Sequence, residues 1–390
     1  MSRITLLPGK EKRVLNHHPW VFRSDIEKVD NEIRPGQIVS VHTHNGRFLS
    51  KAFYNPASQI ALRNMSWKDE PIDDAFIRAQ IHQAIAYRRT FADLRSCRLV
   101  FAESDFLPAL IVDSFGDTLV LQCLALGMEP FKQTVVDALV EEMNPEGIWE
   151  RNDVPVRRLE GLEMTTGLLY GSVPDRVEMK ENGIRFLVDV KEGQKTGYFL
   201  DQKENRKAIA PFVKGRSVLD CFTHTGSFAI HAGFYGANSV RGVDISGYAC
   251  DFASENARLN GLNERVSFTE ANAFDLLAED SRAGATYDTI ILDPPAFTKS
   301  RSALDNAMRG YKEINLRAMK MIRDGGYLVT CSCSQHVRPE MFKKMVMDAA
   351  VDARVLIRQT EFRSQGKDHP ILPQAPETEY LKCGIYQIFH

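Results

Sequence analysis

The stretch Ile290-Ile291-Leu292-Asp293-Pro294-Pro295-Ala296-Phe297 decides the fold of this chain. Its apolar part has no polar alternation, which is typical of a strand buried on both faces of a parallel sheet. Neither proline has an N–H for a strand ladder, and each has φ fixed at about −65°, so the backbone has to leave the sheet after Asp293. We therefore expect Asp293 at the carboxyl end of a strand, where open α/β sheets form their ligand crevice.

Strands and helices alternate along the chain around this stretch, from residue 201 onward. Such alternation predicts a doubly wound, mostly parallel sheet of the Rossmann-like kind. The expected strands are 217–221, 239–244, 266–269, 290–293 and 326–332, and the expected helices are 226–235, 248–260, 311–322 and 339–350.

The first half of the chain has two other patterns. Short apolar runs separated by turn residues predict an all-β domain over residues 1–68, with a hairpin at Asn45-Gly46. Helical spacing of Ile77, Ile81 and Ile85 then opens a small α+β module over residues 69–190, and residues 191–390 form the α/β domain. In the module, the expected helices are 71–95 and 130–143, and the expected strands are 96–102, 107–112, 118–124, 147–150, 167–170 and 184–190.

Composition indicates an ordinary soluble protein, with 44% apolar and 26% charged residues. The net charge of −2 neither favours nor excludes nucleic acid, because one face can be basic while the whole is not. The seven cysteines are an odd number in mostly apolar surroundings, which favours free thiols in a reducing cytoplasm. Cys331 and Cys333 are too close in sequence for both to bind one zinc ion, so no metal is expected. Neither a secretory segment nor a membrane span is expected.

The segment from Val218 to Ala229 predicts a strand, a tight turn at Gly226 and a helix start. Asp244 stands at the end of the next apolar run, where a carboxylate can accept from ribose hydroxyls. The helix N-terminus favours the carboxylate of a ligand. G-x-G-x-x-G is absent, so a pyrophosphate has no cradle, and S-adenosylmethionine fits better than NAD. The alternative is a merely structural strand–turn–helix.

Two further segments are candidates for cofactor binding. Residues 193–202, Gly-Gln-Lys-Thr-Gly-Tyr-Phe-Leu-Asp-Gln, could close over the methionine part, although the pattern alone favours a solvated hinge helix. Asn272 could pair with N1 or N6 of adenine, and Asp275 could be only a helix-start acid. The predicted cofactor-binding residues are Lys195, Thr196, Tyr198, Gln202, Asp220, Phe222, Thr223, Thr225, Gly226, Ser227, Phe228, Asp244, Ile245, Asn272, Ala273 and Asp293.

A run of Asp-Pro-Pro and an aromatic residue after a buried strand is typical of the base-binding site of nucleic acid methyltransferases. The thiols of Cys331 and Cys333 follow another buried strand and are expected at the same sheet edge. A thiolate that adds to C6 of a pyrimidine makes C5 nucleophilic, and an acid at Asp293 could hold the base edge. Both cysteines could equally be small buried hydrophobes. Pro294, Pro295 and Phe297 are the predicted substrate contacts.

The chain resembles the PUA-domain-containing class I methyltransferases that form 5-methylcytidine in bacterial large-subunit ribosomal RNA. The resemblance runs nearly end to end, through the motifs 18–22, 52–56, 103–108, 110–113, 160–162, 194–202, the Thr225-Gly226 turn, 293–297 and 332–334. It implies an N-terminal PUA-like domain, a central α+β module and a class I methyltransferase domain. It also implies S-adenosylmethionine as cofactor, S-adenosylhomocysteine as product, and ribosomal RNA as partner in the cytoplasm, with no membrane; a homodimer is left open.

Carried over residue by residue, the resemblance makes Cys333 the nucleophile and Asp293 the residue at the base edge. Asp244 would hold the ribose, and Asn272 would stand beside adenine, where many relatives carry an acid instead. The related enzymes that place a cysteine directly after Pro-Pro differ from this chain, which has Ala296 there. Two alternatives remain: a guanine N7 or N2 methyltransferase of ribosomal RNA, which needs no thiol, and an RNA-binding protein that kept cofactor binding without catalysis.

Overall fold

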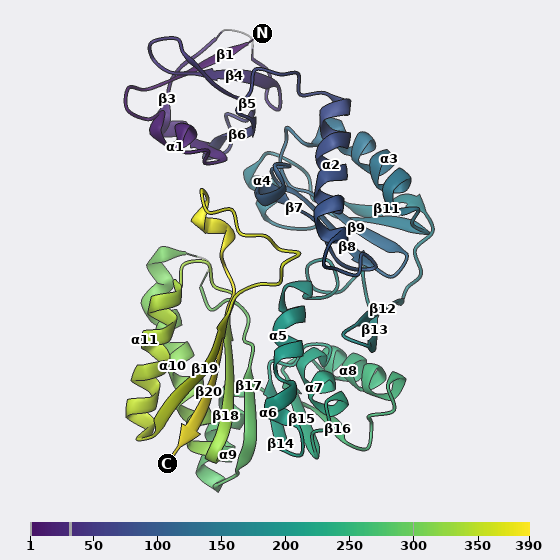
Figure 1. The fold of residues 1–390 in the computed structure, drawn as a ribbon, viewed down its shortest axis with the longest axis vertical. Helices are drawn as coiled ribbons and strands as arrows, with labels where there is room; N and C mark the ends of the chain where they lie inside the picture. Colours follow the sequence, from purple (N-terminus) through teal and green to yellow (C-terminus); the bar gives the residue numbers. More distant parts are fainter. Residues whose placement is uncertain (1, 31–32, 299) are drawn as a thin grey trace. The chain divides into compact units, whose positions relative to one another are not determined.

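The computed structural model describes residues 2–30, 33–298 and 300–390 (Figure 1). Met1, Asn31, Glu32 and Lys299 lie outside the described residues, and the first three fall within the predicted domain 1–68. The chain forms two compact units. The first contains residues 1–180, 187–200 and 367–378, and the second contains residues 181–186, 201–366 and 379–390. The predicted boundaries at residues 68 and 190 stay predictions.

The N-terminal part of the first unit is a six-stranded sheet in the order β2-β6-β5-β4-β1-β3. The predicted hairpin is confirmed, since β4 and β5 pair antiparallel and Gly46 takes φ of 87° in the turn between them. Ile4, Val41 and Leu62 are fully buried in the core of this part. Its elements are β1 Arg3–Leu6, α1 Lys12–Leu15, β2 Trp20–Phe22, β3 Ile26–Val29, β4 Ile38–His42, β5 Phe48–Tyr54 and β6 Ile60–Ser66.

The α+β pattern predicted for the next part of the chain is confirmed by a five-stranded sheet in the order β11-β10-β9-β8-β7. Helix α2 is capped by Asp73, whose side chain accepts from Phe76 N, and it packs through Ile77 and Ile81 into the core that it shares with the sheet. The strand predicted over 107–112 begins three residues later, after a turn in which Ala109 takes φ of 63°. The elements are α2 Asp74–Arg89, β7 Ser96–Phe101, β8 Leu110–Phe115, β9 Thr118–Cys123, α3 Lys132–Met143, β10 Gly147–Arg151, α4 Val156–Leu159 and β11 Thr166–Gly171.

A buried carboxylate joins these two sheets within the first unit. Glu160 is 2% exposed and accepts from Asn55 Nδ2 at 2.9 Å, Ser58 Oγ at 2.7 Å and Arg63 Nη2 at 3.1 Å. The Arg63 guanidinium also donates to Glu103 at 2.9 Å. Because a buried charge is tolerated only when it is paired and hydrogen-bonded, this network fixes the N-terminal sheet against the central sheet.

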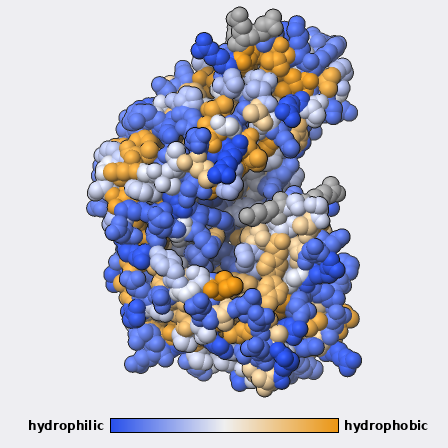
Figure 2. Space-filling view, turned by 180° about the vertical axis from the view of Figure 1, so that it is seen from behind, coloured by the Kyte–Doolittle hydropathy of each residue, from blue (hydrophilic) through white to orange (hydrophobic). Residues whose placement is uncertain are grey.

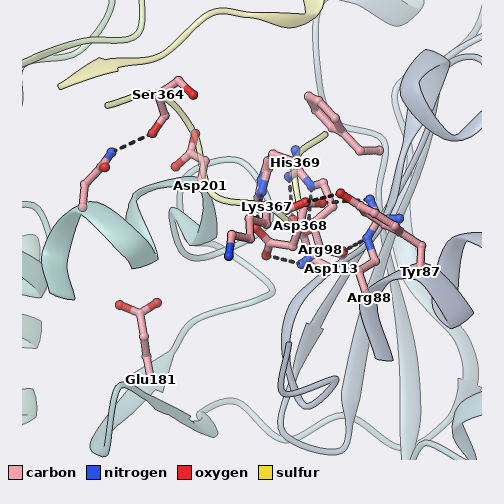
Figure 3. Close-up of polar contacts among 12 residues, drawn as sticks. Tyr87, Arg88, Arg98, Asp113, Glu181, Asp201, Ser364, Lys367, Asp368 and His369 are labelled. Atoms are coloured by element: carbon pink, nitrogen blue, oxygen red, sulfur yellow. Dashed lines mark hydrogen bonds and ion pairs between the residues drawn. The ribbon is translucent and has the colours of Figure 1, made fainter. Parts of the chain in front are cut away.

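Residues 367–378, here called the strap, join the first unit although the chain on either side of them belongs to the second. Figure 3 shows how the strap is held: the fully buried Arg88 donates to the backbone oxygen of Asp368 at 2.8 Å. The same guanidinium donates to Asp105 Oδ1 at 2.8 Å. The Asp368 carboxylate accepts from Arg98 N at 3.0 Å, and His369 Nδ1 lies 2.9 Å from it. Asp368 and His369 of the strap are therefore part of the first unit's interior.

The second unit is built on a seven-stranded sheet in the order β16-β15-β14-β17-β18-β20-β19, preceded by the small hairpin of β12 Val177–Glu181 and β13 Ile184–Val188. Strands β14 to β18 run parallel, and only β20 and β19 bring antiparallel pairing, so the predicted fold class is confirmed. The elements are α5 Lys203–Ala208, α6 Ala210–Val213, β14 Ser217–Cys221, α7 Ser227–Phe234, β15 Ser239–Asp244, α8 Gly247–Leu259, β16 Val266–Glu270, α9 Ala273–Ala283, β17 Tyr287–Leu292, α10 Leu304–Met321, β18 Ile322–Ser332, α11 Pro339–Ala353, β19 Leu356–Arg363 and β20 Lys382–Phe389.

The strand order reverses between β14 and β17. From β14 the chain moves outward through β15 to β16, and from β17 it moves the opposite way to β18. Since parallel crossovers are right-handed, the helices that follow these two directions cover opposite faces. Leu277 of α9, Ile314 of α10 and Val346 of α11 share one core, and Figure 1 shows α10 and α11 on the same side of the strands. The carboxyl ends of β14 and β17 thus meet at a topological switch point, where ligands bind in such sheets.

Apolar side chains are mostly inside the molecule. Figure 2 shows a surface on which hydrophilic residues predominate and hydrophobic residues appear in separate patches on the face drawn. In the described ranges, no helix combines the length and the apolar character that crossing a membrane would need.

Candidate active site

The turn after β14 is shaped by three alternate residues with positive φ, namely Phe222 at 65°, His224 at 51° and Gly226 at 84°. A Cβ on Gly226 would lie 2.8 Å from the ring of Phe268, so only glycine fits there. Helix α7 begins at the next residue, Ser227. The sequence predicted this strand, turn and helix start, and the structure confirms them. Its backbone can approach a ligand closely, and the helix N-terminus favours an anionic group.

Asp220 lies at the end of β14 with its side chain fully buried. Its Oδ2 accepts from Thr223 Oγ1 at 2.6 Å and from Ala229 N at 2.9 Å, which caps the first turn of α7. Burial raises the pKa of Asp220 to about 7, although both hydrogen bonds act against that rise. Oδ1 is buried and has no hydrogen-bond partner among the described residues. The site therefore offers one acceptor that a ligand could satisfy.

Asp244 is fixed between the turn after β14 and the residues that follow β15. It ends β15, and its Oδ2 accepts from His224 N at 2.9 Å, while its Oδ1 accepts from Ser246 N at 3.0 Å. The carboxylate is thereby fixed beside the turn, and its contact with a ribose stays a prediction. Ile245 follows with 70% of its surface exposed, so an apolar side chain stands next to that carboxylate.

Asn272 caps helix α9, and its Oδ1 accepts from Phe274 N at 2.9 Å. This hydrogen bond fixes which way the amide points, so the NH₂ group is the end left for a ligand. Of the two adenine pairings predicted for Asn272, donation to N1 therefore suits it better than acceptance from N6. Asp275 lies in the first turn of the same helix, which confirms it as a helix-start acid.

Asp293 directly follows β17, as predicted, and its backbone N–H donates to Cys221 O at 3.4 Å across the switch point. Gln202 Nε2 donates to Asp293 Oδ1 at 2.9 Å, and Asn205 Nδ2 in turn donates to Gln202 Oε1 at 2.6 Å. This chain of amides orients the carboxylate. Gln202 and Asn205 are buried, so the predicted solvated hinge is wrong at this end of residues 193–202.

The other part of that segment belongs to the first unit. Thr196 is buried, and its hydroxyl donates to Asp113 Oδ2 at 2.7 Å. Tyr198 is also buried, and the Lys195 ammonium lies 4.7 Å from the centre of the Phe199 ring. These contacts contradict a solvated hinge here as well, because the segment is anchored by its own side chains. The role of Lys195, Thr196 and Tyr198 in cofactor binding stays a prediction.

Phe297 lies in an aromatic cluster. Its ring centre is 4.5 Å from that of Tyr311, 5.6 Å from that of Phe274 and 6.4 Å from that of Phe222. Aromatic pairs at such distances contribute packing energy beyond the area they bury. The cluster braces the loop after Pro294 and Pro295 against the cofactor turn. A direct contact of Pro294, Pro295 and Phe297 with substrate stays a prediction.

Cys333 and Cys331 have different surroundings. Cys333 follows β18 directly, is partly exposed, and has its Sγ 3.9 Å from the carbonyl oxygen of Pro294. Cys331 is fully buried opposite Cys383 in the β18–β20 pair, and burial together with Cys383 raises its pKa well above the ordinary range. All seven cysteines are free, as predicted. Only the Cys333 thiol therefore combines access to solvent with contact to the Asp293-Pro294 loop.

Sequence reasoning missed Lys382, Tyr311 and Ser334. Tyr311 OH and Ser334 Oγ lie 2.9 Å apart in the interior next to Cys333, and the Lys382 ammonium donates to the Ser334 carbonyl oxygen at 2.7 Å. One signal for Lys382 was present, since it is a cation at the start of an otherwise apolar strand. In the part of the chain that the structure describes, no three His, Cys, Asp or Glu side chains gather as metal ligands.

The residues present fit S-adenosylmethionine. The buried Asp220 oxygen needs a donor, the Asp244 carboxylate faces the turn, and the Asn272 NH₂ lies at the neighbouring strand end. With the parallel sheet and its switch point, these features define a class I methyltransferase.

Comparison with known proteins agrees with this class. Residues 4–67 match the family of PUA-like domains, and residues 162–370 match the family of S-adenosylmethionine-dependent methyltransferases. Proteins named ribosomal RNA large subunit methyltransferase I from Shewanella amazonensis and Vibrio campbellii are both 42% identical, over 99% and 98% of each chain, respectively. The chain belongs to this family, and its cofactor is S-adenosylmethionine.

Solved structures show the same fold. A protein of Streptococcus mutans assigned as a SAM-dependent methyltransferase superposes with a TM-score of 0.84 at 20% identity, covering 99% of this chain and 100% of its own. A second structure, assigned as a methyltransferase and solved in complex with SAH, has a TM-score of 0.85 at 19% identity with the same coverage. Both likenesses cover 99% of this chain and therefore include both units.

Proposed function

We propose that this protein forms 5-methylcytidine in 23S ribosomal RNA, with Cys333 as nucleophile. The names of its relatives support large-subunit ribosomal RNA as the substrate class. The observation that carries the choice of base is the contact between Cys333 Sγ and the Pro294 carbonyl oxygen, 3.9 Å apart. A thiol in contact with the Asp-Pro-Pro loop has no use in methylation of a guanine nitrogen, which is already nucleophilic.

The chemistry begins at Cys333. Its thiolate adds to C6 of the cytosine. The electron pair of the C5–C6 double bond moves onto C5, in conjugation with C4 and N3, which makes C5 nucleophilic. S-adenosylmethionine, when bound, supplies an electrophilic methyl group for C5. The C5 proton then passes to solvent, the C5–H electron pair re-forms the C5–C6 double bond, the C6–S bond breaks, and Cys333 leaves as the thiolate.

Asp293 would hold the base. Its carboxylate, oriented by Gln202 at 2.9 Å, can accept from the exocyclic N4 amine of cytosine. An acceptor there keeps the base in register for the reaction. Pro294 and Pro295 stiffen the loop, and the Phe297 cluster braces it from behind.

Access to these groups requires an unstacked base. The Cys333 thiol and the Asp293 carboxylate lie at a sheet edge that a base inside a duplex cannot reach. A cytosine in an unpaired loop, or one turned out of its stack, is therefore the expected target. The PUA-like domain is the expected contact for the surrounding RNA.

Covalent trapping tests this proposal. The wild-type protein with S-adenosylmethionine is incubated with large-subunit RNA containing 5-fluorocytidine, and protein–RNA adducts are separated by denaturing gel. Fluorine cannot leave C5 as a proton would, so we expect a stable adduct. Cys333→Ala should bind the cofactor but give neither adduct nor methylation.

Cys331→Ala is the matched control, since it removes a thiol from the same strand two residues away. It should retain both adduct and methylation. Full activity in Cys333→Ala would eliminate the covalent mechanism. Loss of a methylguanosine, and not a 5-methylcytidine, from ribosomal RNA of cells without the protein would instead establish the guanine alternative.

A further inference from the structure

Lys382 is an interior cation beside the proposed nucleophile. It is the first residue of β20, it pairs with Ser332 of β18, and it is only 1% exposed. Its Nζ donates to the carbonyl oxygens of Ser334 and Tyr380, each at 2.7 Å. Because Ser334 follows Cys333 in the chain, these hydrogen bonds hold the ammonium against the backbone that carries the thiol.

The ammonium lacks the usual compensation for burial. Within residues 2–30, 33–298 and 300–390, it forms no ion pair with a carboxylate, and its two acceptors are neutral carbonyl groups. Burial lowers the pKa of Lys382 to about 8, while Cys333 and Glu379 are the groups whose charges act to raise it. A buried charge is costly unless an opposite charge lies nearby. Of these two groups, the Cys333 thiolate is the candidate for a negative partner of the ammonium inside the protein, since Glu379 is exposed to solvent.

We propose that Lys382 is a positioning residue that stabilises the Cys333 thiolate in the reaction proposed above. The thiol gives its proton to solvent, and the fixed ammonium then faces the resulting anion. A nearby lysine is one of the groups that lower the pKa of a cysteine in this way. The role of Lys382 in catalysis rests on the proposed function. The stabilisation of the Cys333 thiolate by the ammonium does not, because it exists in the protein without cofactor or RNA.

Three other titratable groups lie near the thiol: Tyr311, Glu379 and Asp293. Tyr311 of α10 is hydrogen-bonded with Ser334, and burial raises its pKa, so it stays neutral and contributes no charge at pH 7. Glu379 precedes β20, and its negative charge opposes formation of the thiolate. Because Glu379 is exposed, water screens its effect. Asp293 precedes the Pro294 that Cys333 contacts, and its negative charge also opposes the thiolate. Lys382 is the cation among these groups.

The test is the pH profile of alkylation at Cys333 in the full-length, cofactor-free protein. The other six cysteines are buried, so iodoacetamide modification can be followed at this position by peptide mass spectrometry. We expect the wild-type rate to reach half its plateau below the ordinary cysteine value of about 8.5. In Lys382→Met and Lys382→Gln the midpoint should rise by about one pH unit, and the rate at pH 7 should fall about tenfold. The plateau rate at high pH should stay the same.

The controls separate charge from folding. Gln keeps a donor for the carbonyl oxygens without the charge, so it reports on charge if Met perturbs the local fold. Cofactor affinity and circular dichroism should match the wild type in both variants. A wild-type midpoint at or above 8.5, which needs no variant, overturns the proposal, and so does an unchanged midpoint in both variants. A Cys333→Ala protein that still methylates would overturn the proposed function but leave the alkylation result standing.

Discussion

Substitution of Asp220 by Asn should remove a pH-dependent loss in the free energy of unfolding. Burial raises the pKa of this carboxyl to about 7, whereas an aspartate in the unfolded chain titrates at about 3.9. The folded state therefore binds more protons between these values, and stability falls as the pH rises through that window. Asn presents the same oxygen to Thr223 and Ala229 and carries no charge to bury.

The magnitude follows from these two pKa values. By linkage, ionisation of Asp220 costs the wild type about 1.5 kcal/mol at pH 5 and about 4 kcal/mol at pH 8. The free energy of unfolding of the Asn variant does not contain this ionisation term. The stability of the variant relative to the wild type should therefore be about 2–3 kcal/mol greater at pH 8 than at pH 5. The measurement is the free energy of unfolding by urea, followed by circular dichroism in cofactor-free protein at both pH values.

Asp288→Asn is the matched control on the neighbouring strand β17. Burial opposes ionisation of Asp288, but hydrogen bonds from Ser217 N and Oγ and from Arg323 outweigh it and hold the pKa below its ordinary value. Its stabilising effect is lost only as the pH falls through that lowered pKa. The Asp288 variant should therefore be destabilised equally at pH 5 and pH 8. Equal changes for the Asp220 variant at the two pH values would refute the reasoning.

Two further substitutions test the cofactor site and the first unit. Asp244→Ala removes the acceptor of His224 N and Ser246 N together with the expected ribose contact, so affinity for S-adenosylmethionine by calorimetry should fall at least about tenfold, whereas Asp275→Ala should leave it unchanged. Glu160→Ala leaves Ser58 and part of Arg63 without their buried acceptor, while Asn55 Nδ2 keeps only the Glu160 backbone oxygen, and it should destabilise the first unit by about 3 kcal/mol or more in urea unfolding; Glu163→Ala in the same loop should have little effect.

The sequence was most informative where an element is long or ends in a distinctive residue. The apolar run before Asp293 predicted β17 and its position, and the Gly226 turn predicted the start of α7. Helix α9 was not among the expected helices, although Asp275 was considered as a helix-start acid, because Asn272 was considered as a ligand and not as the cap. The antiparallel strands β19 and β20 were missed because β19 is largely polar and 20 or so residues of irregular chain separate the two.

The roles of individual side chains were harder to predict. The contact between Cys333 and Pro294 follows from sheet order, so the sequence could place both residues at one edge. The amide chain from Asn205 through Gln202 to Asp293 could not be predicted, because it depends on a helix that precedes the sheet. The position of the Lys382 ammonium could not be predicted either. It depends on the antiparallel pairing of β20 with β18, which the sequence did not indicate.

The strap has a consequence for how this protein is made. During translation the chain emerges from its N-terminus, and residues 1–200 leave the ribosome long before residues 367–378 exist. Until the strap arrives, Arg88 lacks the backbone oxygen of Asp368, and Arg98 N lacks the carboxylate. The first unit can be completed only after the strap has been synthesised. A chain truncated after β19 and before the strap would therefore lack part of the interior of the first unit.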